Sequence, residues 1–240
     1  MYIGIDVGGT NLAAGVVDDN YQIVARAKMK TQAGRPAEAL CDDLVELAQQ
    51  AAHAGGLRPE DVEYVGIGFP GAVDRENGVV LYTPNAPFRN TPIRAWFHKS
   101  WNVPVYIGND ANCAAVGEYY AGAAAGRHSA VVVTLGTGVG IGVVLEGQTF
   151  LGLNGNGMEG GHTVIVVDGH PCNCGRRGCW EQYSSASALK RLTREEMERS
   201  PSSSMWQMCE GKLENVGGRT AFQAARAGDE AGKRVVGLYI

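Results

Sequence analysis

The sequence predicts an α/β protein built from two similar lobes that face each other across a cleft. Apolar strands alternate with amphipathic helical segments along the 240 residues, of which 45% are hydrophobic, enough for a sizeable core. A strand, a turn rich in Gly and Thr, and a second strand occur at 2–18 and again at 130–145. This repetition indicates a duplicated unit, so we expect lobes over residues 1–109 and 110–240. Chance similarity of two hairpins is the alternative.

The first lobe is expected to combine strands with one long and one short helix. Apolar residues recur at helical spacing before Gly55 and Gly56, which predicts a helix over 37–53. Residues 70–90 are rich in Pro, Gly and Asn and are expected to form loops. The other expected elements are strands at 2–7, 12–18, 21–28, 62–69 and 104–108 and a short helix at 91–100.

The second lobe is expected to begin with a helix over 111–121 and to end in helices. Residues 152–182 lack a clear period and are expected to be irregular, and residues 200–204 read as a polar loop. The other expected elements are strands at 130–135 and 139–145 and helices at 184–199, 205–209, 219–227 and 229–240.

The composition narrows the classes of function. The formal net charge is −4 and no long basic stretch occurs, which argues against a dedicated nucleic-acid binder. No apolar run reaches the roughly 18 residues of a membrane span. The N-terminus also lacks the pattern of a signal peptide. We therefore expect a cytoplasmic protein with small-molecule ligands and no nucleic-acid or membrane partner.

Two glycine-rich turns are predicted to bind phosphate. The first comprises Asp6, Gly8, Gly9 and Thr10, and the second comprises Gly136, Thr137 and Gly138. Each lies between two strands, so neither is a Rossmann fingerprint, in which the turn opens a helix. Glycines let backbone N–H groups approach phosphate oxygens, the threonine hydroxyl adds a donor, and Asp6 can hold Mg²⁺. An ordinary hairpin turn is the alternative for each.

Asp110 is the candidate catalytic base. It follows the strand expected at 104–108, at the mouth of the expected cleft. Phosphoryl transfer requires a carboxylate that accepts the hydroxyl proton, and such assistance is typically worth about 10²–10⁴-fold in rate. An N-cap for the helix at 111–121 is the alternative interpretation of the same residue.

One histidine and three cysteines have the spacing of a structural zinc site. They are His162, Cys172, Cys174 and Cys179. One imidazole and three thiolates complete a tetrahedral Zn²⁺ set and leave no open position for chemistry. We expect the metal to fix Glu159 and Glu181 near the ligand. Three unliganded loop cysteines are the alternative, and Cys41, Cys113 and Cys209 show no partner pattern.

Together these motifs resemble the ROK family of repressors, open reading frames and kinases, and the resemblance is closest to ROK glucokinases. It is carried by DVGGT at 6–10, GND at 108–110, LGTGVG at 135–140, EGGH at 159–162 and CNCGRRGCWE at 172–181. The resemblance spans essentially the whole chain. It implies an actin-like ATPase fold of two RNase H-like lobes, and it suggests a homodimer.

The resemblance also implies roles for individual residues, with Asp110 as the base. The residues expected to contact sugar are Asn85, Asn109, Asp110, Glu159, His162 and Glu181. The residues expected at the phosphates of ATP are Asp6, Gly8, Gly9, Thr10, Asn11, Gly136, Thr137 and Gly138. The zinc ligands correspond to His162 and the three clustered cysteines. Family kinases continue with a Gly-rich loop that packs on adenosine, whereas this chain stops at Ile240, so we expect an incomplete second lobe.

The sequence therefore predicts ATP- and Mg²⁺-dependent phosphorylation of glucose at its 6-hydroxyl, a step of glycolysis. N-acetylglucosamine, N-acetylmannosamine and fructose are alternative acceptors, because a few pocket contacts decide between them. A non-catalytic sugar-binding remnant is a further alternative. A sugar-responsive repressor is disfavoured, because the first strand begins at Tyr2 and leaves no room for a preceding helix-turn-helix.

Overall fold

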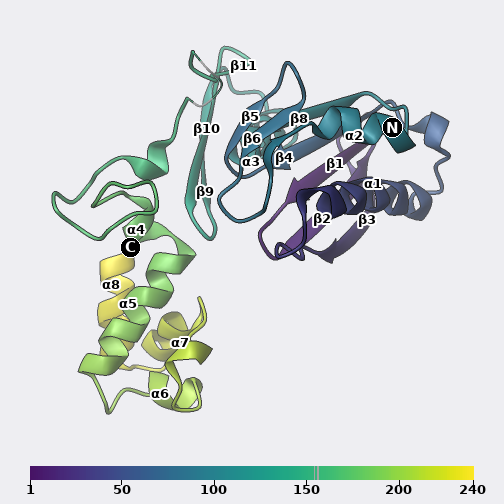
Figure 1. The fold of residues 1–240 in the computed structure, drawn as a ribbon. Helices are drawn as coiled ribbons and strands as arrows, with labels where there is room; N and C mark the ends of the chain where they lie inside the picture. Colours follow the sequence, from purple (N-terminus) through teal and green to yellow (C-terminus); the bar gives the residue numbers. More distant parts are fainter. Residues whose placement is uncertain (154, 156) are drawn as a thin grey trace. The chain divides into compact units, whose positions relative to one another are not determined.

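The computed structural model describes residues 1–153, 155 and 157–240, which fall into two compact units (Figure 1). Unit 1 comprises Met1–Val132 and Gly142–Met158, and unit 2 comprises Val133–Ile141 and Glu159–Ile240. The lobe boundary expected at residues 109–110 is a different division of the chain and stays a prediction. Residues 154 and 156, inside the segment expected to be irregular, lie outside the described residues.

Unit 1 is built on a five-stranded sheet with the order β3-β2-β1-β4-β8. Its strands are β1 (Tyr2–Val7), β2 (Asn11–Val17), β3 (Ile23–Lys30), β4 (Tyr64–Phe69) and β8 (Val105–Asn109). β1, β4 and β8 are parallel, whereas β2 pairs antiparallel with both β1 and β3. All five strands were predicted, because their alternating apolar residues give a period of two.

Helices cover both faces of this sheet. The helices of unit 1 are α1 (Ala37–Ala54), α2 (Ile93–Ser100) and α3 (Asp110–Ala121), with a 3₁₀ turn at Pro59–Asp61. Ile3 and Ile5 of β1 are buried in one core with Leu40 and Leu44 of α1. The alternate positions of β1, including Asp6, point to the opposite face, where α3 packs against β4 and β8.

The segment 70–90, expected to be rich in loops, also contains a second, three-stranded sheet that the sequence did not predict. Its strands are β5 (Ala72–Asp74), β6 (Val79–Tyr82) and β7 (Arg89–Thr91), all antiparallel. The Asp74 carboxylate accepts the Asn77 N–H at 3.0 Å, and Gly78 has a left-handed φ of 69°, which closes the turn between β5 and β6. Strands of three or four residues are too short to show a clear alternation.

A third sheet has the order β11-β10-β9. Its strands are β9 (Ala130–Leu135), β10 (Val139–Leu145) and β11 (Gln148–Thr149). The tip of the β9–β10 hairpin belongs to unit 2, whereas its base belongs to unit 1. The hairpins β1–β2 and β9–β10 both carry a glycine-rich turn at the tip, as the predicted duplication requires.

Unit 2 consists of an irregular segment followed by packed helices. The helices are α4 (Glu181–Ser184), α5 (Ala186–Arg199), α6 (Met205–Met208), α7 (Thr220–Arg226) and α8 (Glu230–Tyr239), with 3₁₀ turns at Gly160–His162 and Leu213–Asn215. Figure 1 shows α5 and α8 side by side, and Met197 and Val235 are buried between the helices of this unit. Asp229 caps α8 by accepting the Gly232 N–H at 2.9 Å. Among the described residues, no helix combines the length and the apolar character that crossing a bilayer requires.

Candidate functional site

The first glycine-rich loop is fixed by hydrogen bonds at both ends. The Gly8 N–H donates to the Asn11 carbonyl at 3.0 Å, and a Cβ on Gly8 would lie only 2.7 Å from that oxygen. The Thr31 hydroxyl donates to the Gly8 carbonyl at 2.6 Å, and the Thr31 N–H donates to the Thr10 carbonyl at 3.0 Å. Thr31, which sequence reasoning missed, therefore ties the loop to the end of β3.

Two further features beside this loop are relevant to ligand binding. Gly9 packs against Asn85, since an added Cβ would lie 3.4 Å from the Asn85 Cβ. Asn85 lies in a turn that the Thr83 hydroxyl closes by donating to the Ala86 carbonyl at 2.7 Å. The Asn11 side-chain oxygen is buried and has no hydrogen-bond partner among the described residues. The first loop thus lies beside a predicted sugar-binding residue and an acceptor that a ligand could satisfy.

The N-cap of helix α3 is Asn109, whereas the sequence alone made Asp110 a candidate for that position. The Asn109 side-chain oxygen accepts the Asn112 N–H at 3.2 Å, and its amide nitrogen donates to the Gly71 carbonyl at 3.2 Å. Asp110 is the first residue of the helix, and its Oδ1 accepts the Ala111 N–H at 2.8 Å. The interpretation of Asp110 as the N-cap was therefore wrong, because Asn109 has that role.

Asp6 and Asp110 belong to one polar cluster at the carboxyl ends of parallel strands. Gly68 of β4 pairs with Asp6 of β1 and with Gly108 of β8, and its position lies against the Asp110 backbone. Ligands of open α/β sheets bind at this edge. Neighbouring atoms restrict the hydration of the Asp6 carboxyl and raise its pKa.

Cys113 of α3 lies within the same cluster, although the sequence showed no pattern for it. A Cβ on Gly108 would lie 2.8 Å from its sulfur, so the missing side chain makes room for the thiol. Atoms packed around the Cys113 sulfur restrict its hydration, and together with the carboxylates of Asp110 and Asp6 they raise its pKa to about 11. The thiol is therefore protonated at neutral pH.

The predicted metal ligands converge in unit 2. The four ligand atoms of His162, Cys172, Cys174 and Cys179 all lie within 4.8 Å of one another. The Cys172 sulfur lies 3.5 Å from His162 Nδ1, and the sulfurs of Cys174 and Cys179 lie 3.6 Å apart. Zinc–sulfur bonds of about 2.3 Å in a tetrahedron place two sulfurs about 3.8 Å apart, so the cluster fits Zn²⁺.

The turn between these cysteines depends on glycine and favours metal binding. Gly175 and Gly178 have left-handed φ values of 87° and 77°. Burial acts to raise the pKa of Cys174, but hydrogen bonds from the Arg176 backbone and from neighbouring thiols outweigh it and lower that pKa to about 7. Burial and the neighbouring thiols raise the pKa of Cys179 to about 12, so the two adjacent sulfurs differ, and Cys174 is the one that ionises more readily.

The second glycine-rich loop lies at the carboxylate of Glu181. Glu181 Oε2 accepts the Val139 N–H at 3.1 Å, and the Gly136 N–H donates to the Gly138 carbonyl at 3.0 Å. Glu159 is exposed and immediately precedes the 3₁₀ turn that carries His162. The structure thus places Glu181 against a predicted phosphate loop, and the sugar contacts expected of both glutamates stay predictions.

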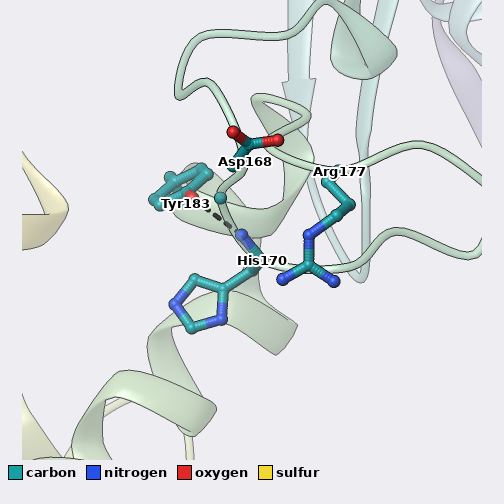
Figure 2. Close-up of a pocket in the computed structure, with 5 residues that line it drawn as sticks. Asp168, His170, Arg177 and Tyr183 are labelled. Carbon is teal, nitrogen blue, oxygen red and sulfur yellow. Dashed lines mark hydrogen bonds between the residues drawn. The ribbon is translucent and has the colours of Figure 1, made fainter.

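A shallow hollow of about 300 Å³ lies beside the metal-binding turn (Figure 2). It is lined by Asp168, Gly169, His170, Arg177 and Tyr183. The His170 N–H donates to the Tyr183 hydroxyl at 3.0 Å, which ties α4 to the chain just before the first cysteine. The charged side chains of Asp168 and Arg177 at this hollow are exposed.

The predicted site residues therefore form two groups. Unit 1 contains Asp6, Gly8, Gly9, Thr10, Asn11, Asn85, Asn109 and Asp110. Unit 2 contains Gly136, Thr137, Gly138, Glu159, His162, Glu181 and the three clustered cysteines. Sequence reasoning missed Thr31 and Tyr183, because each contributes through a contact with a distant backbone group and belongs to no motif.

These features define an α/β protein with two glycine-rich hairpins and a cluster of four side chains that could hold a metal ion. The ROK family model matches residues 2–239, and the chain belongs to the ROK family. The glucokinase of Thermotoga maritima is 37% identical over 228 residues, which are 95% of this chain and 70% of that protein. The glucokinase of Streptomyces coelicolor is 36% identical over 230 residues, with the same coverage. The xylose repressor of Bacillus subtilis is 34% identical over 187 residues, 78% of this chain and 48% of that protein.

Solved structures agree with these relatives. A ROK family glucokinase from Streptomyces griseus, in complex with glucose and AMPPNP, superposes with a TM-score of 0.86 at 35% identity, covering 99% of this chain and 75% of that chain. A ROK hexokinase from Thermus thermophilus superposes with a TM-score of 0.78 at 33% identity, covering 99% of this chain and 73% of that chain. The predicted actin-like ATPase fold is therefore confirmed.

Proposed function

We propose that this ROK family member is a hexose kinase that transfers the γ-phosphoryl group of ATP to the 6-hydroxyl of glucose. The hexose kinase class rests on the similarity to glucokinases in both sequence and structure. The observation that carries the chemistry is the position of Asp110, which directly follows the carboxyl end of β8 and lies against Gly68, the residue that pairs with Asp6. A carboxylate at this edge is suited to accept the proton of a bound hydroxyl.

The proposed reaction assigns one task to each group. Asp110 accepts the proton of the sugar hydroxyl as its oxygen attacks the γ-phosphorus, and ADP leaves with the electron pair of the broken P–O bond. Asn85, Asn109, Glu159, His162 and Glu181 orient the sugar hydroxyls. Backbone donors of the two glycine-rich loops bind phosphate oxygens, where they offset developing charge.

Both metals of the proposal bind to residues of the chain. Asp6 would hold Mg²⁺, whose charge would favour the ionised carboxylate over the protonated form that partial burial favours. Zn²⁺ bound by His162 and the three cysteines acts as a structural cross-link. A cytoplasmic location and a homodimer are further parts of this proposal.

The test measures ADP release by the chain with MgATP and a panel of hexoses. Glucose-dependent turnover is expected to fall about 10²–10⁴-fold in Asp110→Asn, because the variant keeps the shape of the side chain but removes the base. Asp19→Asn, which alters an exposed turn carboxylate, is the matched control and keeps its activity. Circular dichroism and the unfolding midpoint verify that both variants fold.

Three other outcomes are distinct. Faster turnover with N-acetylglucosamine, N-acetylmannosamine or fructose would correct the acceptor. Sugar binding without ADP release would favour a non-catalytic sugar-binding role, to which the similarity with xylose repressors also points. Undiminished turnover in Asp110→Asn would exclude Asp110 as the base.

A further inference from the structure

We propose that residues 181–187, which we call the bracing segment, fix the second glycine-rich loop in its phosphate-binding shape, with Glu181 and Ser187 as positioning residues for ATP. The segment comprises α4 and the start of α5. The inference deepens the proposed function and rests on it, because it takes Gly136–Gly138 as a phosphate loop.

The first contact of the bracing segment is the Glu181 carboxylate. Its Oε2 accepts the Val139 N–H at 3.1 Å, and a Cβ on Gly138 would collide with the same oxygen. The carboxylate therefore occupies the space that a side chain at 138 would take. Hydrogen bonds to a charged group are typically stronger than those between neutral groups.

Two further contacts come from the start of α5. The Ala186 N–H donates to the Gly136 carbonyl at 2.9 Å, and the Ser187 hydroxyl donates to the Thr137 carbonyl at 2.8 Å. In a trans peptide the carbonyl and the N–H of the next residue point in opposite directions. Because the bracing segment binds the carbonyls of Gly136 and Thr137, the N–H groups of Thr137 and Gly138 point away from it. Two consecutive backbone donors therefore face away from the bracing segment, where they are available to an anion.

Two segments that carry predicted metal ligands contact the second loop. One segment precedes Glu181, and the other is the turn that carries His162. Glu181 follows the ligand Cys179 by two residues, and the Trp180 N–H between them donates to the Thr163 carbonyl at 2.8 Å. On the other side, the turn that carries His162 packs on the start of β10, since a Cβ on Gly161 would collide with the Val139 carbonyl. Ligands from both sides bind one ion, so metal binding cross-links the two supports of the loop.

Three further contacts hold the bracing segment, and Figure 2 shows the first of them. Tyr183 accepts the His170 N–H at 3.0 Å, and the Arg191 guanidinium donates to the Gln182 carbonyl at 2.7 Å. Arg191 also lies 2.9 Å from the His170 ring nitrogen. Tyr183 and Arg191 therefore join the bracing segment to His170, two residues before the first cysteine of the cluster.

The affinity for nucleotide distinguishes a positioning role of Glu181 from charge repulsion alone and from sugar binding alone. A carboxylate near anionic phosphates repels them, so charge alone predicts tighter nucleotide binding when Glu181 is removed. A sugar-binding role alone predicts no change in nucleotide affinity without sugar. Only a positioning role predicts weaker nucleotide binding in the absence of sugar.

The test measures the affinity for Mg²⁺–AMPPNP without sugar by calorimetry, and amide hydrogen exchange over residues 136–139. Glu181→Ala is expected to weaken AMPPNP binding about ten-fold or more and to speed exchange of the Val139 amide. Glu181→Gln keeps an acceptor oxygen and is expected to restore most of both. Ser187→Ala is expected to weaken binding several-fold. The controls Glu198→Ala and Ser202→Ala change exposed residues of the same unit and leave both measurements unchanged.

Metal removal extends the test beyond activity. Chelation, with zinc content verified by elemental analysis, is expected to speed exchange over 136–139 and to leave exchange over 8–11 unchanged. Unchanged or tighter AMPPNP binding together with unchanged exchange in Glu181→Ala would overturn the inference. If the unaltered chain binds no AMPPNP, the proposed function fails, whereas exchange at Val139 still decides whether the bracing segment fixes the loop.

Discussion

The two glycine-rich loops lie at the tips of similar hairpins but are fixed by different parts of the chain. Thr31, at the end of a neighbouring strand, holds the first loop through the Gly8 and Thr10 carbonyls. The second loop is held by Glu181 and residues 186–187, which follow a metal-binding turn. Two similar hairpins can therefore carry similar loops although a strand end supports one loop and a helical segment supports the other.

The sheets behind the loops explain this difference. The sheet of the first loop is covered by helices, and its core residues Ile3 and Val65 are almost fully buried. In the sheet of the second loop, Val131 and Leu135 of the edge strand β9 are 64% and 61% exposed. The sheet behind the second loop is less tightly packed than the sheet behind the first. We therefore expect the second loop to depend more on contacts with residues outside its own sheet.

Of the substitutions considered, loss of a metal ligand should produce the largest difference in stability between the units that carry the two loops. Structural zinc contributes on the order of 10 kcal/mol to the folding of small sites, so Cys179→Ser should lower the free energy of unfolding of unit 2 by several kcal/mol. Unit 1 should keep its stability, and thermal unfolding should split into two transitions. Cys113→Ser, at a cysteine outside the cluster, is the control. A single transition with an unchanged midpoint would show that the cluster does not support unit 2.

Gly8→Ala should disturb the first loop alone. The new Cβ would lie 2.7 Å from the Asn11 carbonyl oxygen, so the loop must shift, at a cost of about 1–3 kcal/mol in the free energy of unfolding. Gly9→Ala is the matched control, because its Cβ would make an ordinary contact of 3.4 Å with Asn85. Denaturant unfolding measures both variants. Equal losses in the two variants would contradict the steric argument.

Thr31→Val should have a smaller effect on the same loop. The substitution keeps the shape of the side chain but removes the 2.6 Å hydrogen bond to the Gly8 carbonyl, which is worth about 1–2 kcal/mol at a buried position. Thr31→Ser keeps the hydroxyl and should restore most of the stability. Amide exchange over 136–139 should not change in either variant, and a change there would mean that the two loops share their support.

Asp6→Asn should change the free energy of unfolding least, and it should raise this free energy, whereas the preceding substitutions lower it. Burial raises the pKa of the Asp6 carboxyl in the folded state. Ionisation of this carboxyl therefore lowers the free energy of unfolding, and the full reduction is reached above the pKa of the folded state. Asp6→Asn should therefore be slightly more stable at pH 7, with an advantage that shrinks as the pH falls toward 4, while Mg²⁺–AMPPNP binds more weakly.

Asp229 provides the contrast, because hydrogen bonds outweigh its burial and lower its pKa to about 2. Asp229→Asn should destabilise unit 2 at pH 7.

Local patterns in the sequence were sufficient for much of this protein. The alternation of apolar residues predicted the strands β1, β4 and β8, and helical spacing predicted α1. The spacing of the three cysteines and His162 predicted a cluster that the structure brings within metal-binding distance. Each of these features depends on residues close together in the chain or on a strong period, so a single sequence carries the signal.

Only the tertiary structure decided the features that join distant segments. The choice of Asn109 rather than Asp110 as the cap of α3 depends on how β8 ends beside Gly71. The Thr31 hydroxyl and the Gly8 carbonyl are 23 residues apart, and the Glu181 carboxylate and the Val139 N–H are 42 residues apart. Side-chain hydrogen bonds to backbone groups need no particular residue at the accepting or donating position. The sequence therefore determined the motifs of this ROK protein, whereas folding alone determined which side chains hold them in place.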